Sequence, residues 1–354
     1  MSKRTLIYSA IAVCILGLLL FSKTLRYAWY AFSSSSNKTM VRIYIPNNAT
    51  SPDSIAAILI RNQILDDATG FLAVGAYKKC TAQTTAAGMY EIAPNTALRH
   101  LWNGFTRNAM GNGNAEKTVK VSFENCRSLN DLAGKLAMQL ELDSAAFIAY
   151  IQNGKTLQRL GFSLEQMPAL FIPNTYELYW DQSPADFVGR MAQEFKNFWT
   201  SERKAKLQQV GLQSPSEAVT LASIVYSEQS VRKEEWPIIA GLYLNRIKQG
   251  IKLQSDPTFK FCWGDALKGV GRLLAVHRDI DCPYNTYKIK GLPPGPIYLP
   301  PVGVVDAVLN PGQHDYIFMC AKPDHSMTHN FTASGAVHLK NATAFQHWLD
   351  IGQP

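Results

Sequence analysis

A stretch of helical periodicity between residues 214 and 228 is the clearest pattern in the chain. Its apolar positions recur at three- and four-residue intervals and predict a stripe that faces a core: Ala218, Leu221, Ala222 and Val225. Ser214 suits the N-cap, Pro215 suits the first turn, and Glu217 stands where a capping-box acid reaches back to the cap amide. We therefore predict that a helix begins at Ser214.

Glu228 continues the same stripe, three residues after Val225 and seven after Leu221. Its carboxyl is therefore expected to point toward the buried side of the helix. Loss of hydration raises the pKa of a carboxyl, so this group could hold a proton near neutral pH and deliver it to a leaving group. The alternative is an ordinary surface ion pair between Glu228 and Arg232, four residues further on.

Short strands and helices alternate along the rest of the chain, which predicts an α+β fold. Three similar strand–turn–helix segments predict small α+β modules at 41–64, 88–105 and 117–140. Further elements are predicted as an extended segment at 171–180 and helices at 143–160, 187–199 and 234–248. A loop dense in Pro and Gly at 282–301 is expected to form the wall of a binding groove.

The N-terminal region predicts a membrane anchor. Residues 6–21 form an apolar run broken only by Ser9, and the aromatic residues Tyr27, Trp29 and Tyr30 follow it. No small-residue cleavage site follows the run, so an uncleaved span is favoured over a signal peptide. The expected organisation is an anchor at 1–32, a flexible polar stalk at 33–40, modules at 41–160 and a mixed α/β catalytic domain at 161–354.

Composition narrows the classes of function. The 354 residues are 47% hydrophobic and 18% charged, which is typical of a folded chain of two or three domains. The net charge of +8 comes from scattered Lys and Arg, so we expect no nucleic acid partner. Six cysteines lack metal-binding spacing and no pairing is predicted for them. His325 and His329 lack a third ligand, so we expect no metal and no cofactor.

With these segments in hand, the chain resembles the YceG-like endolytic murein transglycosylases from its N-terminal span to His338. The motifs that carry the resemblance keep the family order: PNTY at 173–176, LASIVYSEQ at 221–229, GLYLNRIKQGIKLQSDPT at 241–258, PYNTYKIKGLPPGPI at 283–297, DAVLNP at 306–311 and HNF at 329–331. The resemblance implies a single-pass inner-membrane enzyme with LysM-like modules. It also implies a periplasmic catalytic body that cuts nascent peptidoglycan glycan strands near peptidoglycan synthases.

In that family, the helix matching 214–228 carries two acids two residues apart, and the second is the catalytic one. Tyr226 occupies the first position here and Glu228 the second. In lytic cleavage of the MurNAc–GlcNAc bond, the C6 hydroxyl of N-acetylmuramic acid attacks its own C1 and leaves a 1,6-anhydro end. One carboxyl can then act twice, so we expect Glu228 to protonate the glycosidic oxygen and then to accept the hydroxyl proton.

The polar positions of the matching motifs are expected to bind sugar hydroxyls and N-acetyl groups: Asn245, Arg246, Gln254, Asp256, Tyr284, Asn285, Tyr287 and His329. Asn285 could also steady a developing charge. Two other functions stay open. The loss of an acid at Tyr226 is compatible with a catalytically impaired, membrane-anchored glycan-binding scaffold. A hydrolase would need a second carboxylate opposite Glu228, for which Asp256 is the candidate.

Overall fold

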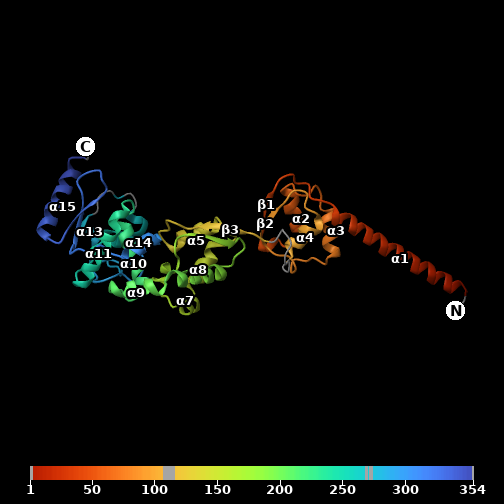
Figure 1. Ribbon diagram of the computed structural model, residues 1–354, viewed down its shortest axis with the longest axis horizontal. Coiled ribbons are helices and arrows are strands. Elements are labelled where there is room, and N and C mark those ends of the chain that lie inside the picture. The colour runs from red at the N-terminus through yellow and green to blue at the C-terminus, as the bar shows by residue number, and fades with distance from the viewer. Residues whose placement is uncertain (1–2, 107–115, 268–269, 271–273, 353–354) are drawn as a thin grey trace. The chain divides into compact units, whose positions relative to one another are not determined.

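The computed structural model of the protein describes residues 3–106, 116–267, 270 and 274–352, and consists of helices and small two-stranded sheets (Figure 1). The predicted α+β class is confirmed. The chain divides into two compact units. The first comprises Met1–Val121, Gln139–Glu141 and Glu177–Gln182, and the second comprises Ser122–Met138, Leu142–Tyr176 and Ser183–Pro354. The domain limits expected from the sequence stay a prediction.

The first unit has one core between a two-stranded sheet and its helices. Its elements are α1 (Lys3–Phe32), β1 (Val41–Ile45), η1 (Asn47–Ala49), α2 (Pro52–Arg61), α3 (Thr69–Tyr77), β2 (Gly88–Ile92) and α4 (Leu98–Phe105). β1 pairs antiparallel with β2, with Val41 opposite Ile92. The Trp102 ring stacks on Phe71 at 4.2 Å within the same core. The segments 41–64 and 88–105 are therefore parts of one packed unit, because their strands are partners in one sheet.

The C-terminal end of α1 packs onto this first unit. The rings of Tyr27 and Tyr77 stack with centroids 3.7 Å apart, and Ala31 is buried in the core. Tyr27, predicted as an interfacial aromatic, thus packs against protein. Among the residues that the structure describes, no helix combines the length and the apolar character that crossing a membrane requires.

Residues 33–40 do not form a flexible stalk, which corrects the prediction. The backbone N–H groups of Ser35 and Ser36 donate to the carbonyls of Thr96 and Ile64, each at 2.8 Å. Ser35 and Asn37 are buried, and the Ser35 hydroxyl donates to Asn37 Oδ1 at 2.6 Å. A run of Ser and Asn looks solvated from composition alone, yet short hydroxyls and amides can equally well satisfy buried backbone groups.

The second unit is mainly helical. Its elements are α5 (Leu129–Ala137), α6 (Ser144–Gln152), α7 (Gly154–Leu160), η2 (Met167–Leu170), α8 (Pro184–Phe198), α9 (Ser201–Gln209), α10 (Pro215–Glu228), η3 (Lys233–Glu235), α11 (Trp236–Lys248), α12 (Asp256–Trp263), η4 (Gly264–Leu267), α13 (Ala275–Arg278), α14 (Val302–Leu309), β5 (Phe318–Ala321), β6 (His329–Thr332) and α15 (Gly335–Asp350). The strands β3 (Thr118–Ser122) and β4 (Thr175–Tyr179) pair with each other, and the chain passes from one unit to the other within each of them. β5 and β6 pair antiparallel. The sequence predicted neither β6 nor α15, and it predicted α6 and α7 as one helix.

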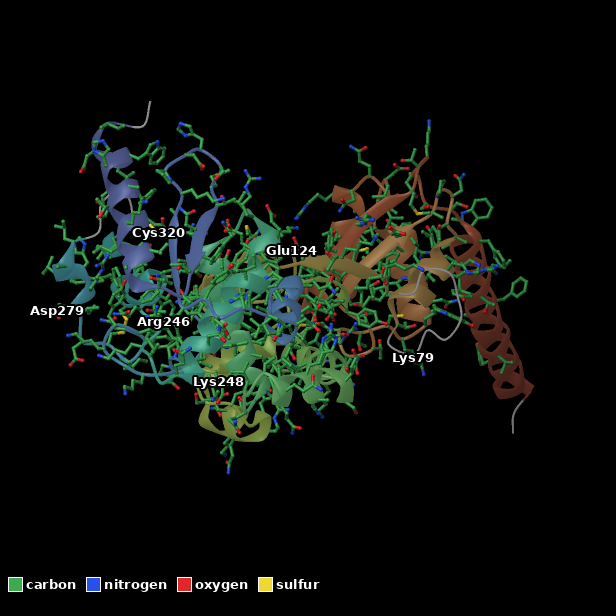
Figure 2. All side chains as sticks on the ribbon, turned by 60° about the vertical axis from the view of Figure 1, so that its left-hand side comes forward. Lys79, Glu124, Arg246, Lys248, Asp279 and Cys320 are labelled. Carbon is green, nitrogen blue, oxygen red and sulfur yellow. A yellow bond between two sulfur atoms is a disulfide. The ribbon has the colours of Figure 1, made fainter. Side chains whose placement is uncertain are left out.

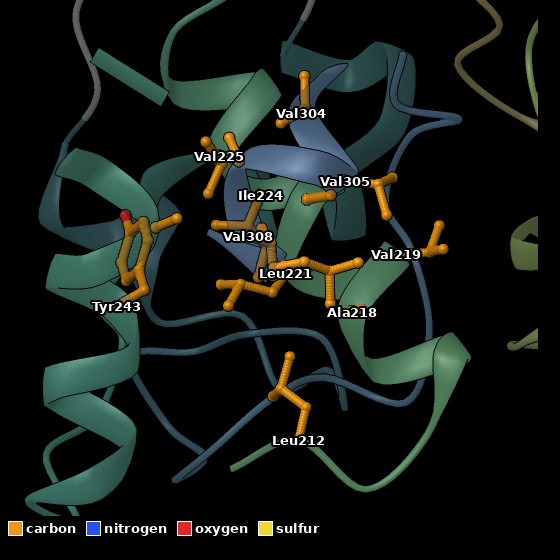
Figure 3. Close-up of a cluster of buried hydrophobic side chains, with 14 of the residues drawn as sticks. Leu212, Ala218, Val219, Leu221, Ile224, Val225, Tyr243, Val304, Val305 and Val308 are labelled. Carbon is orange, nitrogen blue, oxygen red and sulfur yellow. The ribbon is translucent and has the colours of Figure 1, made fainter. Parts of the chain in front are cut away.

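Helix α10 is the buried centre of the second unit. Figure 3 shows its side chains in one cluster with those of α14, with Tyr243 of α11 at the edge. The predicted start is confirmed, because the Ser214 hydroxyl accepts from the Glu217 backbone N–H at 3.2 Å. The Glu217 carboxylate, however, accepts from the Gln213 N–H at 2.7 Å rather than from the cap residue. Strong packing and a firm N-cap together fix where the C-terminal end of α10 lies.

The Pro- and Gly-rich loop is anchored to this core. The Ile297 N–H donates to the Ser223 hydroxyl of α10 at 3.0 Å. A Cβ on Gly295 would lie 1.8 Å from the Glu165 carbonyl oxygen, so only glycine permits this close approach. A disulfide that the sequence did not predict joins Cys262 of α12 to Cys282, 20 residues later. The loop is therefore part of the rigid frame of the second unit.

Candidate active site

A cavity of about 460 Å³ lies at the C-terminal end of α10 in the second unit. Side chains from α10, α11, α12, β5, β6 and α15 line it. Six of the residues predicted for the site are brought together here: Glu228, Arg246, Gln254, Asp256, Tyr287 and His329. Figure 2 labels two of the lining residues, Arg246 and Cys320.

Glu228 is the last residue of α10, and one of its two carboxyl oxygens is held firmly. Oε1 accepts a hydrogen bond from the Tyr243 hydroxyl at 2.7 Å and another from the Ser255 hydroxyl at 2.5 Å. Within the described part of the chain, no group hydrogen-bonds Oε2. The predicted alternative partner, Arg232, donates instead to the Ser326 carbonyl at 2.8 Å. Oε2 is therefore the oxygen that can meet a ligand.

The surroundings of Glu228 favour its protonated form. Burial raises the pKa of this carboxyl above its ordinary value. The hydrogen bonds from Ser255 and Tyr243 oppose that rise because they stabilise the carboxylate, whereas the negative charge of Asp256 adds to it. The net direction is upward. Glu228 thus keeps its proton at a higher pH than an ordinary glutamate, which is the property of a general acid.

Asp256 lines the same cavity, and its hydrogen-bond and ion-pair partners differ from those of Glu228. The Tyr287 hydroxyl donates to Asp256 Oδ1 at 2.6 Å, and the Arg278 Nε lies 3.8 Å from the same oxygen. The Arg278 guanidinium also stands 5.3 Å from the centre of the Tyr287 ring. The carboxylate is therefore paired with a cation and a hydroxyl.

The guanidinium of Arg246 holds segments of the cavity wall together and is not left free to bind a ligand. It is buried, and its guanidinium donates to the Lys252 carbonyl at 2.9 Å and to the Ile317 carbonyl at 2.7 Å. Its remaining nitrogen donates to Gln254 Oε1 at 2.6 Å. Gln254 is exposed and has a positive φ of 55°. Its amide oxygen is held by Arg246, so its NH₂ group is the part that can donate to a ligand.

Three residues predicted to bind sugar do not line this cavity. The Asn245 amide donates to the carbonyls of His314 and Tyr316 at 2.7 and 3.1 Å. The side chain of Asn285 is fully buried and donates to two backbone carbonyls, each at 2.8 Å. Tyr284 lines a separate cavity beside the Pro- and Gly-rich loop. Asn245 and Asn285 hold the backbone, so the proposal that Asn285 steadies a developing charge is wrong in this geometry.

Tyr226 faces away from the Glu228 cavity. Its hydroxyl donates to Asn125 Oδ1 at 3.1 Å, and the residue lines another cavity together with Asn174 and Trp236. Two residues along a helix turn through about 200°, so Tyr226 and Glu228 occupy different sides of α10. Of the two positions, Glu228 is therefore the one whose side chain reaches the cavity described above.

His329 of β6 reaches the cavity from a buried ion pair. Its Nδ1 lies 2.7 Å from Glu235 Oε2, and its backbone N–H donates to Glu235 Oε1 at 2.8 Å. The Gln229 amide donates to Glu235 Oε2 at 2.9 Å. Sequence reasoning found His329 but missed Glu235, because the run of residues 233–235 is charged and looks like solvated surface.

Sequence reasoning also missed both hydrogen-bond donors to Glu228. Tyr243 lies in the apolar stripe of α11 and reads as a core residue, while Ser255 lies in the motif around Gln254 without any distinguishing feature. Only the position of Ser255 within a family motif could have singled it out. Neither spacing nor charge indicates that two hydroxyls 12 residues apart converge on one carboxyl oxygen.

Comparison with known proteins places the chain in a family. The model of the YceG-like family matches residues 43–344. The chain belongs to the YceG-like family. The endolytic murein transglycosylase of Bacillus subtilis (strain 168) is 26% identical over 319 residues, which cover 86% of this chain and 84% of that protein. An endolytic murein transglycosylase of Streptococcus pneumoniae is 31% identical over 108 residues, 30% of this chain and 19% of that protein.

A solved structure shares the fold of this YceG-like chain. A putative YceG-like protein of Listeria monocytogenes aligns with a TM-score of 0.53 and 21% sequence identity. The alignment covers 86% of this chain and 99% of the other. At this level of identity the likeness concerns the fold.

Proposed function

We propose that this protein is an endolytic lytic transglycosylase that cuts peptidoglycan glycan strands between N-acetylmuramic acid and N-acetylglucosamine. Family membership and the name of the Bacillus subtilis relative support the reaction class. The observation that carries the proposal is the state of Glu228, a carboxyl with a raised pKa, one oxygen fixed by two hydroxyls and the other free toward a cavity.

In the proposed reaction, Glu228 protonates the glycosidic oxygen as the C1–O bond breaks. The C6 hydroxyl of the same N-acetylmuramic acid attacks C1 and forms the 1,6-anhydro ring, and its proton passes to a base in the cavity, which the single-carboxyl mechanism takes to be Glu228 after its own proton has left. The Glu228 carboxylate that remains is stabilised by the hydroxyls of Tyr243 and Ser255, which are already in place. The Gln254 amide and the Tyr287–Asp256 pair are suited to hold sugar hydroxyls and N-acetyl groups at the cavity wall.

The test compares the full-length wild type with Glu228→Gln on purified glycan strands, with mass analysis of the ends. Glu234→Gln is the matched control, because Glu234 is exposed and lies outside the cavity. Internal fragments with 1,6-anhydro ends from the wild type and the control, but not from Glu228→Gln, are the expected result. Reducing ends would indicate hydrolysis with Asp256 as the second carboxylate. Strands retained but uncut by the wild type would indicate a scaffold.

We infer further that the protein is held in the inner membrane by its N-terminal segment, with the remainder on the periplasmic side. The apolar run at 6–21, broken only by Ser9, supports this, together with the absence of a second run of that kind in the sequence. The expected outcome is that the full-length protein stays with membranes in alkaline carbonate and is degraded by protease added to the periplasmic side. Release by carbonate would contradict the anchor.

We also propose that the β1–α2–α3–β2 part of the first unit is a LysM-like glycan-binding module. A cavity of about 450 Å³, lined in part by the polar and aromatic side chains of Arg42, Tyr44, Arg61 and Asn62, suits a polar ligand such as a sugar. Tyr44→Ala is expected to weaken retention of the full-length protein on insoluble peptidoglycan. Unchanged retention would remove this cavity from consideration. Cross-linking in cells is the direct test for peptidoglycan synthases as partners.

A further inference from the structure

The Glu235–His329 pair is a built feature of the cavity that the single-carboxyl mechanism does not use. The side chains of His329 and Glu235 are only 16% and 7% exposed. Glu235 holds His329 at two points, through the ring at 2.7 Å and through the backbone N–H at 2.8 Å. Gln229 fixes the carboxylate in turn at 2.9 Å. The orientation of the imidazole ring is therefore set by the fold.

This geometry also determines which ring nitrogen carries the hydrogen. Burial alone would raise the pKa of Glu235, but the hydrogen bonds from His329 and Gln229 outweigh it and hold the pKa below its ordinary value. An ionised carboxylate only accepts hydrogen bonds, so Nδ1 of His329 must donate. In the neutral ring the lone pair then lies on Nε2. No described residue hydrogen-bonds Nε2, and His329 lines the cavity together with Glu228.

We propose that His329 is the base of the reaction and accepts the C6 hydroxyl proton of N-acetylmuramic acid, with Glu235 as the residue that positions it. This rests on the proposed function and assigns one of its two proton transfers to a second residue. Glu228 gives its proton to the glycosidic oxygen, and the C1–O bond to the leaving sugar breaks. The C6 oxygen bonds to C1, and its proton moves to Nε2 of His329. Transfer of that proton through water to Glu228 restores both groups.

Electrostatics favour the assignment of the two proton transfers to two different residues. When the step is complete, Glu228 is a carboxylate and His329 an imidazolium, so opposite charges arise together in one cavity where screening by water is weak. Glu235 faces the imidazolium directly, as a carboxylate does in other acid–base sites. A single carboxyl would instead need Oε2 alone to reach both the glycosidic oxygen and the C6 hydroxyl, because Oε1 already accepts two hydrogen bonds.

Other ionisable groups share the cavity and contribute to any pH dependence. Besides Glu228 and His329, the ionisable residues that line it are Tyr243 and Arg246 of α11, Asp256 of α12, Arg278 of α13, Tyr287, Cys320 of β5 and His338 of α15. Among the described residues, His338 is the second histidine of the cavity. It stacks on Phe318 at 4.9 Å, which makes it the matched control.

The experiment measures kcat and KM of the full-length protein on glycan strands between about pH 5 and pH 9. We expect a bell-shaped wild-type profile, with an acidic limb from His329 and an alkaline limb from Glu228. His329→Gln is expected to lower kcat about 10²–10⁴-fold, leave KM nearly unchanged and remove the acidic limb. His338→Gln is expected to keep the acidic limb.

Glu235→Gln separates a positioning role from a purely structural one. Removing the carboxylate takes away the negative charge that stabilises the imidazolium, so the acidic limb should move to lower pH, with a smaller loss in kcat. Three results would overturn the assignment while leaving the proposed function intact: an active wild type without an acidic limb, a His329→Gln protein with the wild-type profile, or loss of the limb in His338→Gln instead. A wild type that forms no anhydro ends contradicts the proposed function itself.

Discussion

Replacing Tyr243 by Phe tests how the acid is tuned. The substitution removes the hydroxyl that donates to Glu228 Oε1 at 2.7 Å and leaves the buried ring in the core. Ser255 still donates to the same oxygen at 2.5 Å. The carboxylate therefore loses one of its two hydrogen bonds, while the cavity keeps its shape. Because that bond stabilises the charged form, its loss raises the pKa of Glu228 further.

The size of the effect follows from the charge on the acceptor. A hydrogen bond to a charged group contributes about 1.5–3 kcal/mol. If the carboxylate is largely formed in the transition state, its loss slows the chemical step by about 10- to 150-fold. In the proposed reaction the protonated form of Glu228 is the active one, so a higher pKa is expected to extend activity toward alkaline pH. Tyr243→Phe should thus have a lower maximal rate and an alkaline limb displaced to higher pH.

The assay is the release of 1,6-anhydro ends as a function of pH, with initial rates at saturating glycan. Tyr226→Phe is the matched control, because its hydroxyl binds Asn125 in a different cavity, and we expect its rate and its profile to equal those of the wild type. An alkaline limb that stays in place or moves to lower pH in Tyr243→Phe would refute the reasoning. Loss of activity in Tyr226→Phe would show that the wrong side of α10 has been assigned to the substrate.

Two further predictions concern stability. Replacing Cys262 and Cys282 by Ser opens a 20-residue loop and should lower the free energy of unfolding of the second unit by about 3 kcal/mol, which urea unfolding with and without reductant can check. Burial, together with the charge of Asp181, raises the pKa of Glu116 to about 8 from 4.5. The fold therefore favours the protonated form, so stability should fall as pH rises through this range, and Glu116→Gln should remove that fall in melting temperature.

The position of the Glu228 side chain could be predicted because it depends on local signals. The cap at Ser214 and the spacing of the apolar residues fix the phase of α10, and the phase alone places Glu228 on the buried side and Tyr226 elsewhere. Two details of the helices differ from the prediction, because the local sequence rules are less specific there. Glu217 reaches back one residue further than a capping box requires, and Asn153 interrupts the predicted helix at 143–160.

The partners of the acid could not be predicted, because they come from distant segments. Arg246 was expected to bind sugar, but its donors meet a carbonyl 71 residues away at Ile317. Glu235 looks exposed in sequence, and it is buried only because β6 brings His329 against it across 94 residues. Asn285 was expected to bind sugar, but its amide donates to two backbone carbonyls. An amide in a loop gives no local sign of which carbonyls will surround it.

The end of a helix is a suitable place for an acid of this kind. As the last residue of α10, Glu228 lies at the negative end of the helix dipole, which disfavours the carboxylate and adds to the effect of burial. Tyr243 and Ser255 oppose both effects by stabilising the carboxylate. In the proposed reaction, the first pair of effects would keep the proton on Glu228 before the bond breaks, and the second pair would lower the energy of the charge that appears once the proton has left. Since the two hydroxyls act through Oε1, proton release from Oε2 needs no rearrangement of the hydrogen bonds already formed.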